Sequence, residues 1–489
     1  MLFNSLSFLI FLAIIFLVYY ITPQKLRWII LLISSFYFYM CWKIESVLIL
    51  ISYIFINYVV AIKINESTKV KENKLKNKFY ISISVISSIG MLLFFKYFNF
   101  FNSALRELFE HFNLFYGVKN INIIAPLGIS FYTFKTLSYV IDVYRGIQKP
   151  EKNIAYFALY VSFFPQILAG PIDRASNLLP QLHEKHSFDY DLVTEGFRRI
   201  LWGAFKKIVI ADRLALIVNQ VYNHSHNYSG LPFIIATYSY ALQLYCDFSG
   251  YSDMAIGTAK VFGIKSIENF NYPYISQTIS EFWRRWHMSL SNWFNDYVYM
   301  PIVFSKKELG KIAVVIAAIV TFSLSGLWHG AAWTYVIWGT MHGIGVSFDA
   351  LTKKQHKKLK KKCNKTIFKY VSIFITFNFV CFSFIFFRAN SIQDAVYIVK
   401  NLFNFGNKSS ILAYSTNLMS SGFTRIDMIN AIISIIVLQI VELLERREKK
   451  FDILKHKPLV LRWISYYIII LWIIFFGVFG AREFIYFQF

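Results

Sequence analysis

Charged residues are scarce in this chain, and the motifs of several common soluble enzymes are absent. Only 16% of its 489 residues are charged, whereas a soluble protein of this length carries roughly a quarter. The sequence contains no Walker A loop and no HExxH, GxGxxG or GxSxG motif, so it gives no support to ATP hydrolysis, zinc proteolysis or α/β-hydrolase chemistry. Four cysteines without ligand spacing predict neither a disulfide framework nor a metal site.

Apolar residues take the place of the missing charge. Hydrophobic residues make up 56% of the chain and aromatic residues 19%, and the mean hydropathy is +0.46. Apolar runs long enough to cross a bilayer recur from end to end, which predicts an all-α polytopic membrane protein. The candidate spans are 5–22, 27–43, 46–62, 79–101, 122–144, 154–170, 197–221, 231–250, 312–328, 331–350, 367–387, 427–444 and 461–481.

The net charge of +24 comes mainly from lysines in short segments between the apolar runs. This is the positive-inside pattern, so we expect the basic segments to lie beside membrane lipid and predict no nucleic-acid partner. Three of them, 63–78, 353–369 and 445–457, are predicted to be cytoplasmic loops. Counting spans outward from these loops places the N-terminus, the polar loop 390–425 and the C-terminus on the outer side.

Two segments in the middle of the chain fit simple spans badly. The stretch 163–182 contains three prolines and a glycine, a density that breaks helices, and we expect a re-entrant or surface-lying segment there. The stretch 279–302 mixes tryptophans with charged side chains. It is too polar to span a bilayer and too aromatic for a free loop, so it predicts an interfacial or re-entrant amphipathic helix.

His329 stands in the apolar stretch SGLWHGAAWTY (325–335), at the break between two spans and toward the outer side. An ionisable group at membrane depth needs a partner or a function. One interpretation is a structural histidine that is hydrogen-bonded within the bundle. The other is a general base that removes the proton from a hydroxyl nucleophile.

Glycines and tryptophans flank this histidine. Gly326 and Gly330 predict close approach of a substrate to the backbone. Trp328 and Trp333 are candidate walls of a pocket, and Trp328 is included among the predicted donor- or substrate-binding residues.

His287, in WRRWHMSLS, has two interpretations of the same kind. It is either an interfacial histidine or a second active-site histidine. In the second case Arg284 or Arg285 would meet the phosphates of a charged donor, because a guanidinium suits bidentate phosphate contacts. Asn292 and Asp296 are added to the predicted donor- or substrate-binding residues.

Other polar residues on an apolar background are expected to be structural. Asp247 and Asp253 need partners if they are buried, and an arginine of 284–285 or Arg174 is the predicted partner. His342, which lies in the span after His329, is expected to serve packing.

Six blocks, taken together and in order, resemble the membrane-bound O-acyltransferase (MBOAT) family. The resemblance extends over most of the chain and is closest to the bacterial branch that O-acetylates alginate, peptidoglycan and cellulose. The blocks are PLGISFYTF…SYVIDVYRG (126–146), FFPQILAGPIDR (163–174), DFSGYSDMAIG (247–257), NFNYPYISQTISEFWRRWHMSLSNWFNDYVYMPI (269–302), GLWHGAAWTYVIWGTMHG (326–343) and the ending FIYFQF.

The resemblance implies a single MBOAT-like domain over 1–489, with N-terminal helices in 1–120, a catalytic core in 121–350 and C-terminal helices in 351–489. It implies a ring of about 11–13 tilted transmembrane helices, with an outward funnel and a cytosolic tunnel that meet near the catalytic histidine. In the family that histidine belongs to the WHG block, here His329, and the second implicated histidine belongs to the RWH block, here His287.

The resemblance also implies the reaction and its setting. A cytosolic thioester, acetyl-CoA, would donate an acetyl group for O-acetylation of a cell-surface polysaccharide, with no tightly bound cofactor. A secreted or membrane-anchored SGNH-type acetyltransferase would be the partner, and the bacterial cytoplasmic membrane the location. D-alanyl transfer to teichoic acid is the alternative within the family. A lipid or polysaccharide transporter is the alternative outside it, although we find no inverted repeat.

Overall fold

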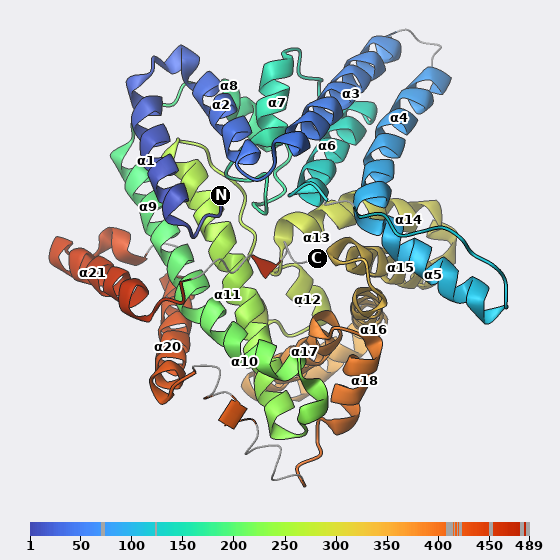
Figure 1. Ribbon diagram of the computed structural model, residues 1–489, viewed down its shortest axis with the longest axis vertical. Helices are drawn as coiled ribbons and strands as arrows, with labels where there is room; N and C mark the ends of the chain where they lie inside the picture. Colours follow the sequence, from blue (N-terminus) through green and yellow to red (C-terminus); the bar gives the residue numbers. More distant parts are fainter. Residues whose placement is uncertain are drawn as a thin grey trace. The chain divides into compact units, whose positions relative to one another are not determined.

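The computed structural model describes residues 1–69, 74–122, 125–406, 423–448 and 453–479, with positions 414, 416, 417, 419, 484 and 485. This part of the chain is helical and contains no strand, so the prediction of an all-α polytopic membrane protein is confirmed (Figure 1). Six helical segments within it are long and apolar enough to cross a membrane. They are Ile44–Thr68, Lys74–His111, Lys311–His329, Lys365–Arg388, Arg425–Glu448 and Leu459–Phe476.

Helices also occupy the other predicted spans, although these are shorter or more polar than the six. They are α1 (Leu6–Ile21), α2 (Arg27–Met40), α6 (Ile129–Tyr144), α7 (Ile154–Ser162), α9 (Tyr190–Ala204) with α10 (Asp212–Tyr222), α11 (Leu231–Val261) and α16 (Trp333–Lys362).

The predicted span 154–170 is wrong in its second half. Helix α7 ends at Ser162, and the chain continues without regular helix to α8 (Ala175–His183). Pro165 explains the end, because a proline disfavours helical geometry at the residue before it. The irregular stretch is almost entirely buried, and its amides find partners inside the protein: the N–H of Phe164 donates to Oγ of Ser35 at 3.0 Å. The helix break predicted for 163–182 is confirmed only before Ala175, because α8 contains Pro180. The irregular part is buried, so a surface-lying segment is wrong, and a re-entrant path stays a prediction.

The single amphipathic helix predicted over 279–302 is also wrong. The segment folds as α12 (Ile279–Trp283), α13 (Met288–Phe294), a π-helical turn (Asn295–Tyr299) and α14 (Met300–Ser305). The break between α12 and α13 falls at His287, whose φ of 41° lies in the left-handed region and cannot continue a helix.

The three basic segments are mostly helical, and not loops as predicted. Helix α3 (Ile44–Lys69) and α4 (Lys74–Leu92) cover most of 63–78, and α20 (Arg425–Glu448) begins the third segment. Helix α16 continues through the lysines to Lys362, because lysine has a good helix propensity and the helix can outlast its apolar part. Residues 70–73 and 449–452 lie outside the described part. The orientation derived from these segments stays a prediction.

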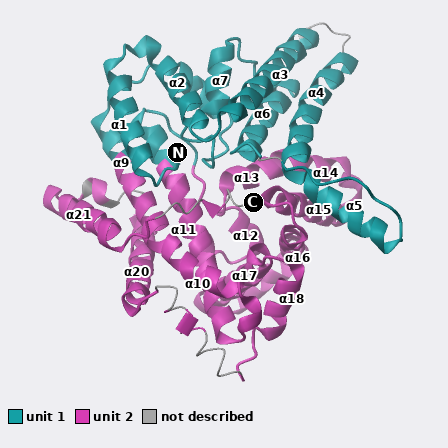
Figure 2. Ribbon diagram, viewed as in Figure 1, with its two compact units in different colours: residues 1–196, 255–267 teal, residues 197–254, 268–489 magenta. Residues whose placement is uncertain are grey.

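The helices divide into two compact units (Figure 2). Unit 1 comprises 1–196 and 255–267, and unit 2 comprises 197–254 and 268–489. The expectation of one domain with three parts is not tested by this division and stays a prediction.

Short polar side chains connect the helices of unit 1. The hydroxyl groups of Tyr53 and Ser88 lie 2.7 Å apart, and Ser84 donates to Asn57. Such small polar contacts hold α3 against α4, as is usual between helices in membranes.

Native cysteines test the orientation. Cys41, after α2, and Cys363, after α16, are both exposed, and the lysine pattern places them on opposite sides of the membrane. In intact cells an impermeant thiol reagent should label a variant that retains only Cys41, and a variant that retains only Cys363 should label only after lysis. The opposite labelling would reverse the predicted orientation.

Candidate active site

A tight helical hairpin in unit 2 positions His329. Helix α15 (Lys311–His329) ends at this histidine, and α16 begins four residues later at Trp333, so the predicted break between spans is confirmed. Gly326 and Gly339 allow the close packing: a Cβ added to Gly326 would lie 2.1 Å from the carbonyl oxygen of Tyr335. Small residues at such crossings let helix backbones approach each other.

This packing changes the interpretation of the two flanking glycines. They were predicted to leave room for a substrate, but both face α16. A Cβ on Gly330 would lie 2.1 Å from the ring of Tyr335, so the absence of a side chain there serves the hairpin.

Aromatic rings enclose the side chain of His329, which is 2% exposed. Its ring centroid lies 5.0 Å from those of Trp328 and Trp338 and 5.4 Å from that of Phe387, which belongs to α17 (Lys365–Arg388). All three contacts are edge-to-face. Trp328 therefore contacts the histidine, whereas Trp333 is 51% exposed, and the prediction that these two residues wall a pocket stays a prediction.

His287 is fully buried, and Asn269, in the irregular segment between α11 and α12, holds it. Its Nδ1 lies 3.0 Å from Oδ1 of Asn269. The same oxygen accepts from the backbone N–H of Ser289 at 3.3 Å and from its hydroxyl at 2.8 Å. The Nδ2 of Asn269 donates to Ser252 on α11 at 3.1 Å. One carboxamide thus organises the turn that carries the histidine.

These bonds determine which nitrogen of His287 carries the proton. A backbone N–H can only donate, so the Asn269 atom that receives it from Ser289 is the carbonyl oxygen. The Nδ1 of His287 must then be the donor, and Nε2 carries the lone pair of the neutral ring. Burial lowers the pKa of His287 to about 3, which keeps this ring neutral at physiological pH.

Trp328 brings the two predicted catalytic histidines into one cluster. Its ring lies 5.0 Å from His329 and 6.1 Å from His287. The hairpin and the turn before α13 therefore meet at this tryptophan, and both histidines are part of one buried aromatic centre in unit 2.

His342 has the packing role that was predicted for it. Its Nδ1 accepts from the indole N–H of Trp283 at 3.1 Å, and Nε2 lies 2.9 Å from the hydroxyl of Ser383. Because that hydroxyl donates to the carbonyl of Val380, it accepts from the histidine. Both ring nitrogens are satisfied, which joins α12, α16 and α17.

Asp247 and Asp253 are paired, but the predicted partners were wrong. Asp253 contacts Arg199 at 2.9 Å and Lys206 at 2.5 Å, and Asp247 contacts Lys207 at 2.6 Å. The lysines lie on a π-helical stretch, Phe205–Ala211, between α9 and α10. Two lysines within an otherwise apolar run were the sequence signal for these pairs, because buried charges require partners.

Helix α11 connects these ion pairs to the histidine cluster. Phe248 follows Asp247 and meets the ring of His287 edge-to-face at 4.5 Å. Near the C-terminus, the N–H of Ile485 donates to Asp247 at 2.9 Å, and Phe484 packs on Phe248 at 5.5 Å. The ion pair of Asp247 and the ring contact of Phe248 with His287 thus come from consecutive residues of α11.

The predicted donor-binding residues fall into two groups. Arg285 is held by Glu281 at 2.9 Å and donates to the carbonyl of Asn271 at 3.1 Å. Arg284, Asn292 and Asp296 are exposed. Their binding roles stay predictions, and of the two arginines Arg284 has the more accessible guanidinium.

Within the described ranges no three His, Cys, Asp or Glu side chains gather as metal ligands. The centre consists of His329 and His287 in an aromatic enclosure of a polytopic membrane protein. Imidazole in such a setting suits proton transfer during acyl transfer to a hydroxyl.

Comparison with known proteins gives the family. The family model of MBOAT, the membrane-bound O-acyltransferase family, matches residues 151–391, which include both histidines. The chain is 36% identical to the probable alginate O-acetylase AlgI of Pseudomonas aeruginosa, over 83% of this chain and 75% of that protein. It is 33% identical to a peptidoglycan O-acetyltransferase of Helicobacter pylori, over 82% of this chain and 80% of that protein. A teichoic acid D-alanyltransferase of Bacillus subtilis is 35% identical to this chain, over 54% of this chain and 68% of that protein.

The chain therefore belongs to the membrane-bound O-acyltransferase family. It is an O-acyltransferase and a multi-pass membrane protein.

Replacing Asn269 tests the organisation of the turn. Asn269→Ala removes the acceptor of three buried donors, and a buried donor without a partner costs about 1–3 kcal/mol. We expect a lower unfolding temperature in detergent and lower activity. Asn271→Ala is the control, because this side chain is exposed and the hydrogen bonds recorded for Asn271 in the described part of the chain are made by its backbone. Equal unfolding temperatures of the two variants would contradict the role given to Asn269.

Proposed function

We propose that this enzyme moves an acetyl group from cytosolic acetyl-CoA across the membrane for O-acetylation of a cell-surface polysaccharide. The observation that carries the proposal is the enclosure of His329 at the end of α15, in one aromatic cluster with His287 and within the region that the family model matches.

In the proposed reaction His329 acts as the general base. It takes the proton of the acceptor hydroxyl while that oxygen attacks the thioester carbonyl. The new C–O bond forms, the C–S bond breaks, and the proton passes to the leaving thiolate. His287 is the second histidine of the site, and Asn269 orients it so that Nε2 presents the lone pair.

The aromatic enclosure supports this chemistry in two ways. Trp328, Trp338 and Phe387 exclude water, which would otherwise hydrolyse the thioester. They also fix the ring of His329, and positioning is a large part of catalysis for a reaction that joins two substrates.

The relatives support the proposed acceptor and acyl group. Those with the longer matches are named for O-acetylation of alginate and of peptidoglycan, both envelope or extracellular glycans. A secreted or membrane-anchored SGNH-type acetyltransferase as partner, and the bacterial cytoplasmic membrane as location, are part of the same proposal.

D-alanyl transfer to teichoic acid is the second candidate, because the D-alanyltransferase relative is about as similar over the part it shares. That match covers only 54% of this chain, against 83% for the alginate relative, so we favour acetyl transfer. Release of CoA from acetyl-CoA by the purified protein, compared with release from a D-alanyl carrier thioester, distinguishes the two donors.

His329→Gln should abolish surface acylation. Glutamine keeps the volume and hydrogen bonding but cannot take the proton, and loss of a general base costs roughly 10²- to 10⁴-fold in rate. The measurement is ester released from cell-surface polymer by mild alkali, normalised to the amount of enzyme in the membrane.

His342→Gln is the matched control, because it changes a buried histidine of the same unit whose role is packing. It should retain most of the ester per molecule of enzyme. Near-normal ester in His329→Gln would make His329 structural and direct the search for the base to His287.

Arg284→Ala should raise the KM for acetyl-CoA more than it lowers kcat, since an exposed guanidinium suits the phosphates of the donor. Arg285→Ala should instead lower the amount of folded enzyme, because it leaves Glu281 without its partner. If the KM of Arg284→Ala equals that of the unchanged enzyme, Arg284 does not bind the donor.

A further inference from the structure

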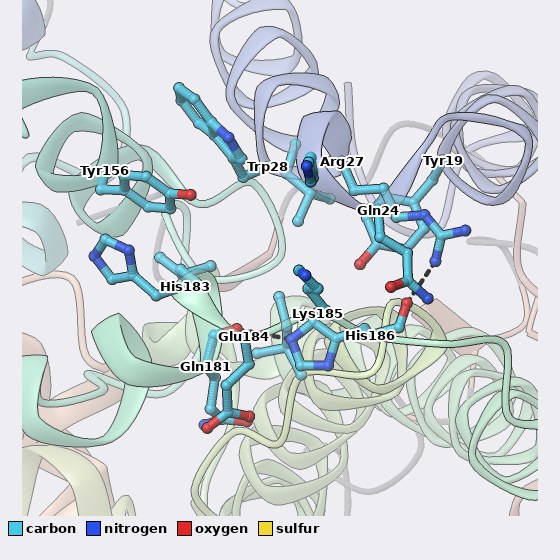
Figure 3. A pocket seen from close by; sticks show the side chains of 14 residues that line it. Tyr19, Gln24, Arg27, Trp28, Tyr156, Gln181, His183, Glu184, Lys185 and His186 are labelled. Atoms are coloured by element: carbon cyan, nitrogen blue, oxygen red, sulfur yellow. Dashed lines mark hydrogen bonds between the residues drawn. The ribbon is translucent and has the colours of Figure 1, made fainter.

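A polar cavity of about 200 Å³ lies in unit 1, remote in sequence from both histidines. Four parts of unit 1 line it: the turn between α1 and α2 with the adjoining helix ends, the start of α7, the end of α8 with the chain after it, and Ile264 after α11. Figure 3 shows Trp28, Tyr156 and His183 on one side of the cavity, and Arg27, Gln24 and His186 on the other.

Basic side chains predominate in this cavity. Lys25, Arg27 and Lys185 line it, against one acidic residue, Glu184. Both lysines are exposed, so their ammonium groups are available to a ligand.

Arg27 differs from the two lysines because it is buried, with 9% of its surface exposed. Its guanidinium donates to the backbone carbonyls of Tyr20, Thr22 and His186, and none of its recorded partners in the described structure is a carboxylate. Carbonyl groups hold the side chain in place but do not neutralise it. A buried cation at a cavity wall therefore favours an anionic ligand.

Stacked rings form the opposite wall. The ring centroids of Trp28 and Tyr156 lie 4.6 Å apart, and those of Tyr156 and His183 lie 3.8 Å apart. Tryptophan and tyrosine are typical of the level of the lipid headgroups, where their apolar rings and polar edges are both accommodated.

The cavity begins where α1, a helix with exposed apolar side chains, ends. Helix α1 carries a row of exposed apolar side chains whose last members, Leu17 and Ile21, are 58% and 82% exposed. Gln24, the first residue of the cavity after this row, follows three positions later. A lipid whose acyl chains lie along α1 would bring its headgroup to the cavity, and the lysine pattern places this end of α1 on the cytoplasmic side.

We propose that this cavity binds the phosphate headgroup of an anionic phospholipid, which the side chains of Lys25 and Lys185 and the buried charge of Arg27 recognise. Basic pockets between helices at the cytoplasmic surface have the chemistry for such headgroups. The site is independent of the acyl-transfer reaction and would anchor the first two helices to the inner leaflet.

Native mass spectrometry of the full-length protein in non-ionic detergent tests the proposal, with phosphatidylglycerol as the anionic probe and phosphatidylcholine as the zwitterionic one. The protein should bind phosphatidylglycerol in preference to phosphatidylcholine. The double variant Lys25→Gln, Lys185→Gln should bind it roughly 30-fold more weakly, since each lysine near an anionic headgroup contributes about 1 kcal/mol.

The matched control is Lys357→Gln, Lys358→Gln, which removes the same charge from exposed positions on α16 and should leave the affinity unchanged. Inorganic phosphate and CoA, added as competitors, should not displace the lipid. Equal weakening by both double variants, or no weakening by either, would overturn the proposal. Displacement by a soluble phosphate compound would show that the cavity takes a free phosphate and not a lipid.

Discussion

Polar groups inside an apolar bundle must find their partners within the protein, and the carboxamide of Asn269 shows how the candidate active site meets this constraint. Its oxygen receives the imidazole N–H of His287 and both donors of Ser289. This arrangement holds a histidine in left-handed backbone geometry and fixes its neutral tautomer. The ion pairs of α11 obey the same constraint: Lys207 meets Asp247, and the next residue of the helix supports His287.

Much of the fold could be predicted because membrane-spanning helices need long apolar runs, and every predicted span contains helix. The helix ends were less predictable. Lysines continue α16 to Lys362, since propensity and not hydropathy decides where a helix stops outside the apolar region. Within 279–302 composition indicated amphipathicity but could not reveal the break at His287, which depends on a backbone torsion that hydrogen bonds to another segment stabilise.

The sequence was enough to predict the two histidines of the site, but not the residues that support them. Histidines on an apolar background stand out, and the structure brings His329 and His287 to the same tryptophan. The residue that holds His287 could not be identified from the sequence. Asn269 lies in a polar stretch without a recognisable motif, and its role arises only from tertiary contacts. The flanking glycines were noticed but misinterpreted. Small residues suggested room for a substrate, but the ring of Tyr335 occupies the space beside Gly330.

The central claim of the proposal is that the enzyme transfers an acyl group from one side of the membrane to the other, with His329 as its general base. Inverted membrane vesicles from producing cells expose the cytoplasmic face, so acetyl-labelled acetyl-CoA can be supplied to that face alone. Alkali-labile label should accumulate on polymer inside the vesicles, protected from an added esterase until lysis, and should be absent with His329→Gln. Equal label with that variant, or label that the esterase removes before lysis, would contradict the account.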